Sequence, residues 1–138
     1  MDKKTLIEHL NHDLEGEMGA VIHYTLYAKT VKGPYYEDVA EMFDKLAMVE
    51  FEHMKELADQ IVLLGGTPST TPRPMKLLRR LDELVKYNLE QEEIAIEDYK
   101  KRIKEAEQLG EVGVRLMIEH IIAEEYQHFL SFKRLLGK

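Results

Sequence analysis

Cysteine is absent from all 138 residues of the sequence. Its absence excludes disulfide bonds, cysteine-based zinc sites, iron–sulfur clusters, covalently attached c-type haem and a cysteine nucleophile. A chain without cysteine fits the reducing cytoplasm, where we expect this protein to act. Glycine and proline are also scarce, with 8 and 4 residues, so collagen-like and low-complexity architectures are excluded.

The chain also lacks an excess of positive charge and long apolar runs. Its formal net charge is −7, whereas a nucleic-acid-binding surface needs a basic stripe to contact phosphates. Apolar runs are short, as at residues 61–64, and residues 1–10 contain no apolar core of signal-peptide length. We therefore expect neither a nucleic acid nor a membrane as a partner.

What the sequence does contain is apolar residues at helical spacing along nearly its whole length. They recur every three or four residues in four segments, and each segment predicts an amphipathic helix. Breaks at residues 33–34, 65–74 and 109–113 separate the segments. We expect a single all-α domain over residues 1–138, built as a four-helix bundle.

The connection between the second and third helices is long, and its length predicts the topology. If Glu50 and Glu92 lie at one level and their helices are parallel, residues 64–78 must cover about 42 Å, at ~1.5 Å per helical residue. An extended link of this length reaches roughly 46–50 Å, whereas an antiparallel pair would need only a short turn. We therefore expect two helical hairpins joined by an end-to-end crossover.

Polar residues interrupt the apolar stripe of each helix at one level. The six residues are Glu17, Glu50, His53, Glu92, Glu125 and His128. Their spacing from apolar neighbours places them on the core side, and a histidine three residues after a glutamate can share an ion with it. A single Glu-x-x-His pair would be weak support, because about one arises by chance in a chain this rich in glutamate.

The arrangement of the six residues repeats within the chain. The first and second glutamates are 33 residues apart, as are the third and fourth, and a shift of 75 residues maps one pair onto the other. The same shift maps His53 onto His128 and aligns the apolar positions of both halves. This pattern indicates an internal repeat of one helical hairpin, about residues 5–64 and 76–136, with the polar residues meeting at a pseudo-twofold axis.

Four buried carboxylates are costly unless cations neutralise them. One interpretation is that they are core polar residues satisfied by neighbouring cations, but the stripes contain no lysine or arginine at this level. Two divalent ions would balance the four negative charges, and glutamate and neutral histidine are suitable ligands for iron and manganese. We therefore predict a dinuclear metal site.

The sequence resembles the ferritin-like di-iron superfamily, and within it most closely the bacterioferritins. The resemblance covers nearly the whole chain and is clear in the first helix. There Asn11, Glu17 and Tyr24 match the spacing of an asparagine, a ligand glutamate and a core tyrosine in the family. The resemblance implies a ferritin-like four-helix bundle that binds two iron ions, with manganese or zinc as substitutes.

The resemblance also implies a role for each predicted ligand. Glu17 and Glu92 would be terminal ligands, one for each metal. Glu50 and Glu125 would bridge the two metals, and His53 and His128 would each complete the ligand set of one metal. The implied activity is a ferroxidase, which oxidises Fe(II) with O2 or H2O2 for iron storage or detoxification in a homo-oligomer. Two alternatives stay open: a small di-metal oxidase or peroxide scavenger that stores nothing, and a metal-binding module without turnover.

The sequence departs from the bacterioferritins at two places. Phe51 stands where they carry the haem-ligating methionine, so we do not expect haem, and Met48 or Met54 would be the alternative haem ligand. We also expect no counterpart here to the fifth helix of the large bacterioferritin shells. We therefore expect a homo-oligomer that is a dimer or a larger shell, without a prediction of its size.

Two related families fit less well. Rubrerythrins carry a seventh ligand at the position of Ala95 and use a cysteine-bound iron, so their peroxide-reducing mechanism is disfavoured. The DNA-protecting miniferritins place their metal site between subunits, whereas the motif here lies within one bundle. Both comparisons leave the bacterioferritin type as the preferred interpretation.

Several other polar residues need an interpretation. Asp13 and Asn88 are related by the 75-residue shift, and we expect them either to accept the outer N–H of a ligand histidine or to make polar contacts near the stripe. Tyr24 and Tyr99 are expected to be core aromatics. Expected at the surface or an interface are His9, His12, His23 and His120. Four further glutamates lie off the apolar stripe, and we exclude them from the site: Glu52, Glu90, Glu93 and Glu124.

Overall fold

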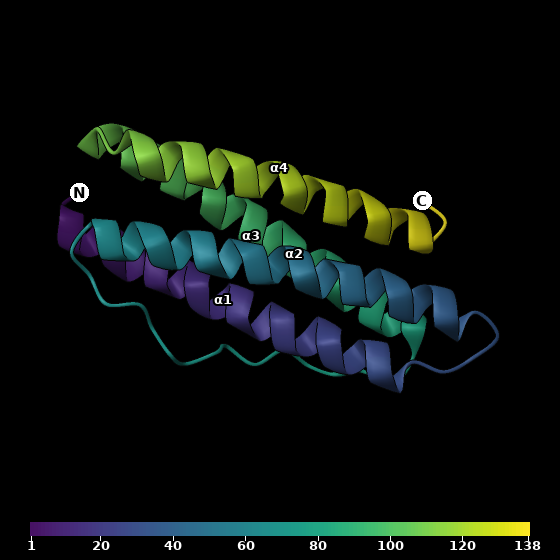
Figure 1. The fold of residues 1–138 in the computed structure, drawn as a ribbon. Helices are drawn as coiled ribbons and strands as arrows, with labels where there is room; N and C mark the ends of the chain where they lie inside the picture. The colour runs from purple at the N-terminus through teal and green to yellow at the C-terminus, as the bar shows by residue number, and fades with distance from the viewer.

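Four long helices make up the structure, and no strand is present. The computed structural model describes all residues, 1–138. The helices are α1 (Lys3–Thr30), α2 (Tyr36–Leu63), α3 (Leu81–Leu109) and α4 (Val112–Leu135). They run side by side along one common axis, as Figure 1 shows. The predicted all-α four-helix bundle is confirmed.

Local sequence signals define several helix ends. Asp2 caps α1, because its side chain accepts a hydrogen bond of 2.8 Å from the backbone N–H of Thr5. Gly110 ends α3 in the left-handed conformation, with φ of 68°, which glycine adopts without steric cost. The chain then turns directly into α4, so α3 and α4 form a tight hairpin.

The helices pair as two hairpins, and a long connection joins them. α1 packs chiefly against α2, and α3 chiefly against α4. The connection, residues 65–80 and here called the strap, runs from the end of α2 along the outside of α1 to the start of α3 at the opposite end of the bundle (Figure 1). This confirms the predicted crossover, with α3 beginning at Leu81 rather than near residue 78.

Hydrogen bonds to α1 hold the strap in place. The Asn11 side chain donates to the carbonyl of Thr67 at 3.0 Å and accepts from the N–H of Ser69 at 2.7 Å. The N–H of Arg73 donates to the carbonyl of Glu15 at 2.9 Å. A Cβ at Gly19 would lie only 1.9 Å from the Arg73 carbonyl oxygen, so the strap can approach α1 this closely only over a glycine.

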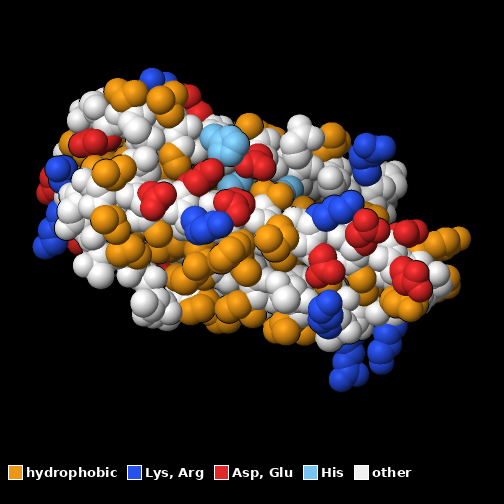
Figure 2. Space-filling view, in the orientation of Figure 1, with side chains coloured by type: hydrophobic (Ala, Val, Ile, Leu, Met, Phe, Trp, Pro, Cys, Tyr) orange, Lys and Arg blue, Asp and Glu red, His pale blue; other side chains and the backbone are white.

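Two apolar clusters fill the ends of the bundle. The first is mainly aliphatic and is centred on residues such as Leu10, Leu57 and Ile118. The second is rich in aromatic rings, and Tyr27 and Phe43 lie in it with a centroid distance of 4.8 Å. None of the four helices has the continuous apolar length that a membrane-spanning segment requires. The face in Figure 2 mixes acidic, basic and apolar side chains.

Candidate metal centre

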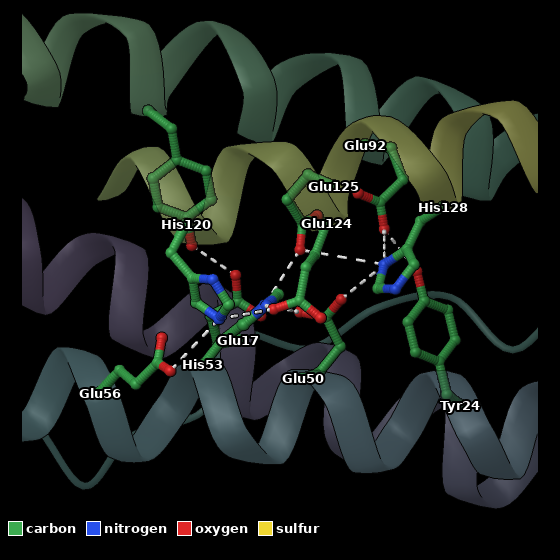
Figure 3. A network of polar contacts seen from close by, with 11 residues as sticks. Glu17, Tyr24, Glu50, His53, Glu56, Glu92, His120, Glu124, Glu125 and His128 are labelled. Carbon is green, nitrogen blue, oxygen red and sulfur yellow. Dashed lines mark hydrogen bonds and ion pairs between the residues drawn. The ribbon is translucent and has the colours of Figure 1, made fainter. Parts of the chain in front are cut away.

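All six residues predicted for the site lie between the two apolar clusters, and every helix contributes to them (Figure 3). All are nearly inaccessible to solvent, since their exposed fractions range from 0% to 5%. They are Glu17 on α1, Glu50 and His53 on α2, Glu92 on α3, and Glu125 and His128 on α4. The structure therefore brings together every residue that the sequence singled out.

The six side chains form two overlapping groups, each compact enough to surround one ion. In each group the potential ligand atoms lie within 4.8 Å of one another. We name them position 1, formed by Glu17, Glu50, His53 and Glu125, and position 2, formed by Glu50, Glu92, Glu125 and His128. Glu50 and Glu125 belong to both groups. Two shared carboxylates between two four-residue groups are the arrangement of a di-metal site.

Each histidine turns its Nδ1 atom into this cluster. Nδ1 of His53 lies 3.3 Å from Glu50 and 3.1 Å from Glu125. Nδ1 of His128 lies 2.9 Å from Glu50. The Nε2 atom of each ring therefore points away from the four glutamates of the cluster, and Nδ1 is the atom that can bind a metal.

Several atoms of the cluster are buried without a hydrogen-bonding partner. They are one carboxylate oxygen each of Glu17, Glu50, Glu92 and Glu125, and Nδ1 of His128. An unsatisfied buried polar atom costs about 1–3 kcal/mol, so five of them at one place require a compensating group. Divalent cations satisfy carboxylate oxygens and imidazole nitrogens at once. The donor set therefore fits a dinuclear metal centre.

Protonation takes over part of this role when no metal is bound. Burial raises the pKa of Glu125 well above its ordinary value, and the neighbouring carboxylates of Glu50 and Glu92 raise it further. Burial would lower the pKa of His128, but the neighbouring carboxylates of Glu50 and Glu92 outweigh this effect and raise the pKa to about 9. Protons on these two groups offset the negative charge that metal ions would otherwise balance.

Two tyrosines bind the glutamates that belong to one position only. Tyr24 donates a hydrogen bond of 2.9 Å to Glu92, and Tyr99 donates one to Glu17. Both rings are buried, as expected for core aromatics. Each tyrosine comes from the hairpin opposite its glutamate, so the pair ties the two hairpins together at the cluster.

Of the two roles expected for Asp13 and Asn88, the structure shows polar contacts near the stripe, because neither residue contacts a histidine of the cluster. Asp13 accepts two hydrogen bonds from the buried guanidinium of Arg102, at 2.6 and 2.9 Å. Burial raises the pKa of Asp13 to about 6, against the opposing effect of Arg102. Asn88 pairs with His23 at 2.8 Å, and His23 is buried rather than at the surface as expected.

Glu124 was excluded from the site by its position off the apolar stripe, yet it contacts a proposed ligand. Its Oε1 atom lies 3.1 Å from Nε2 of His53, on the side away from the cluster (Figure 3). The same oxygen lies 3.0 Å from Nε2 of His120. Helical periodicity could not reveal this contact, because Glu124 reaches from the edge of α4 across to α2.

Comparison with known proteins agrees with this geometry. The ferritin-like domain family matches residues 7–138. Among characterised relatives, the bacterioferritin of Desulfovibrio desulfuricans is 26% identical over 135 residues, which cover 96% of this chain and 75% of the relative. The bacterioferritin of Brucella melitensis is 26% identical over 124 residues, which cover 89% of this chain and 77% of the relative.

Solved structures show the same similarity. Ferritin-like, diiron-carboxylate proteins from Bacillus anthracis superimpose with a TM-score of 0.94 at 36% identity over 99% of both chains. The Desulfovibrio desulfuricans bacterioferritin, described with a diiron site, gives 0.88 at 25% identity over 96% of this chain and 78% of that one. A Dps protein from Bacillus brevis, 17% identical, shares the fold with a TM-score of 0.91 over 99% of both chains. The matched family and the buried carboxylate–histidine cluster together show that this chain belongs to the ferritin-like domain family.

Proposed function

We propose that this protein is a ferroxidase, which binds two iron ions in positions 1 and 2 and oxidises Fe(II) with O2 or H2O2. The observation that carries the proposal is the pair of four-residue groups that share Glu50 and Glu125. Iron is the metal we infer because the donors are carboxylates and imidazoles and because relatives are named bacterioferritins. The six cluster residues would act as the ligands.

The surroundings of the cluster support this chemistry. Two iron ions held side by side can each give up one electron, so that one oxidant takes up two electrons in a single event. Glu50 and Glu125 would hold the ions close together, and the hydrogen bonds from Tyr24 and Tyr99 fix the orientation of the outer carboxylates. The apolar clusters at both ends keep bulk water out of the bundle interior.

A cavity offers the oxidant a way to this cluster. It has a volume of about 320 Å³ and lies between α1 and α3, beneath the strap at Arg73 and Met75. Its inner wall includes Glu17 and Glu92. Ala95 also lines it, and this small side chain leaves room for a diatomic molecule or a peroxide beside the carboxylates.

We further propose that the oxidised iron is stored or detoxified within a homo-oligomer. The relatives named above support storage, and exposed apolar side chains on the helices are available for contacts between subunits. They include Ile22, Leu26, Met48, Phe51 and Leu116. The alternative is a non-storing oxidase or peroxide scavenger, which would use the same ligands but retain only the resident ions.

An aerobic Fe(II) titration of metal-free protein tests these proposals. Oxidation is followed by absorbance, and iron per chain is counted after desalting. Retention far above two ions per chain would support storage. Rapid oxidation with retention of about two ions would support the non-storing alternative. Absence of both oxidation and retention would contradict the ferroxidase and leave a cluster without turnover.

A further inference from the structure

The two metal positions differ in what lies behind their histidines. At position 1, Nε2 of His53 faces the Glu124 carboxylate at 3.1 Å. That carboxylate is itself held by His120, whose Nε2 atom lies 3.0 Å from it and 3.6 Å from Glu56. His53 therefore has a fixed and charged acceptor on its outer side.

At position 2, no side chain hydrogen-bonds to Nε2 of His128. The 75-residue shift that relates the two hairpins in sequence places Val49 where Glu124 stands in the other half. Valine cannot accept a hydrogen bond. His128 is also slightly exposed, with 7% of its side chain accessible, whereas the His53 side chain is fully buried.

The groups that contact the glutamates of the two positions are matched. Each terminal glutamate accepts a hydrogen bond from a buried tyrosine, Glu17 from Tyr99 and Glu92 from Tyr24. Glu50 and Glu125 are common to both positions. The partner of the histidine is thus the main difference between two otherwise similar metal positions.

The carboxylate network lies in a surface hollow of about 460 Å³ between α2 and α4. Its walls include Val49, Glu56, His120 and Glu124. Figure 2 shows histidine side chains bordered by acidic groups on this face. Glu124 is partly exposed, with 36% of its side chain accessible, so it can be replaced without opening the core.

We propose that Glu124 makes the two metal positions unequal, so that position 1 keeps its metal ion and position 2 exchanges its ion. A carboxylate behind a ligating histidine fixes the proton on the outer nitrogen and makes the inner nitrogen a better donor, and its loss typically costs 10–100-fold in metal affinity. His128 lacks this support. In the proposed ferroxidase, on which this inference rests, iron at position 1 would be the resident cofactor and iron at position 2 would be the substrate.

The test uses Zn(II), which binds the same donors without redox chemistry. Metal-free protein is crystallised with one equivalent of Zn(II) per chain, and occupancy at each position is measured by anomalous scattering. Calorimetric titration gives the two dissociation constants in solution. For the wild type we expect zinc mainly at position 1 and a tight and a weak binding step, separated by about 10–100-fold.

Variants at the related positions 124 and 49 should both reduce this difference, the first by weakening position 1 and the second by strengthening position 2. Glu124→Ala should weaken the tight step by about 10–100-fold and equalise the occupancies. Glu124→Gln should recover part of this loss, because its amide oxygen still accepts from Nε2 of His53. Val49→Glu should strengthen the weak step by supplying the missing acceptor behind His128. Glu52→Gln is the matched control, because Glu52 lines the same hollow but pairs with Lys55.

Equal occupancies in the wild type would overturn the inference, as would an unchanged tight step in Glu124→Ala or a loss of equal size in the Glu52→Gln control. No recovery in Glu124→Gln would overturn the hydrogen-bonding explanation. Thermal unfolding of each metal-free variant shows that the fold is intact. Failure of the ferroxidase proposal would give a different result. The wild type would then bind no pair of metal ions, or it would bind a pair of metal ions without oxidising Fe(II).

Discussion

The hairpin of α1 and α2 and the hairpin of α3 and α4 supply matching donors to the cluster, but their surroundings differ. Tyr24 and Tyr99 make equivalent contacts, since each donates a hydrogen bond to a terminal glutamate of the other hairpin. One helical turn before those glutamates the two hairpins differ, because Asp13 binds Arg102 whereas Asn88 binds His23. The comparison teaches that the inner geometry of a di-metal site constrains both halves alike, while the residues behind it can differ and tune each position separately.

Removing a shared carboxylate should have the largest effect, because it should weaken metal binding at both positions. Glu50→Ala or Glu125→Ala is expected to abolish paired metal binding and to lower the initial rate of Fe(II) oxidation by more than about 100-fold, beyond the loss typical of an outer partner. Glu17→Ala should affect position 1 alone. Metal counting and anomalous scattering distinguish these outcomes, and a metal pair surviving in Glu50→Ala would refute the bridging role.

The related residues Asp13 and Asn88 offer a test of stability rather than of metal binding. Asp13→Ala removes the nearest carboxylate from the buried Arg102, which keeps only Glu105 at 3.3 Å, and should lower the free energy of unfolding by an amount at the lower end of about 3–5 kcal/mol. Asn88→Ala removes only a neutral partner of His23 and should cost about 1–3 kcal/mol. Urea unfolding of the metal-free variants measures both losses. Equal losses would show that the Asp13–Arg102 pair has no special weight.

The metal-free protein should become less stable as the pH rises from 6.5 to above 9. The pKa of His128 is 6.5 in an unfolded chain and about 9 in the fold, so its stabilisation is complete below pH 6.5 and is lost as the pH passes 9. Glu125, whose pKa is also raised, acts in the same direction. The expected loss is on the order of 3 kcal/mol. Urea unfolding in a chelator at pH 6.5 and 9.5 measures it, and His128→Ala should flatten the dependence. Constant or rising stability would contradict these protonation states.

The tyrosines should give the smallest and most symmetrical effect. Tyr24→Phe and Tyr99→Phe each leave one carboxylate oxygen without its donor, so each should weaken one metal position by about tenfold, near the lower end for an outer partner. Tyr24→Phe should act on position 2 and Tyr99→Phe on position 1. Zinc titration with site-resolved occupancies checks this assignment. If Tyr24→Phe weakened position 1 instead, this would contradict the assignment of Tyr24 to Glu92.

The sequence predicted the bundle, the crossover and the position of the six cluster residues because each depends on helical periodicity and chain length. Glu17 and Glu92 interrupt apolar stripes, and a link of this length reaches from one end of the bundle to the other. The contact between Glu124 and His53 could not be predicted in this way, since it joins the edges of two helices whose rotation about their axes is set by packing. For the same reason His23 could not be recognised as buried, because the partner that justifies its burial, Asn88, lies on another helix.

The proposed di-iron centre requires that six buried side chains hold two iron ions through two shared glutamates. Crystals of metal-free protein soaked in Fe(II) without oxygen, and measured at the iron absorption edge, test it most directly. We expect two anomalous peaks, one beside Glu17 and His53 and one beside Glu92 and His128, with Glu50 and Glu125 beside both. No peak in the cluster, or a single iron bound by all six residues, would contradict it.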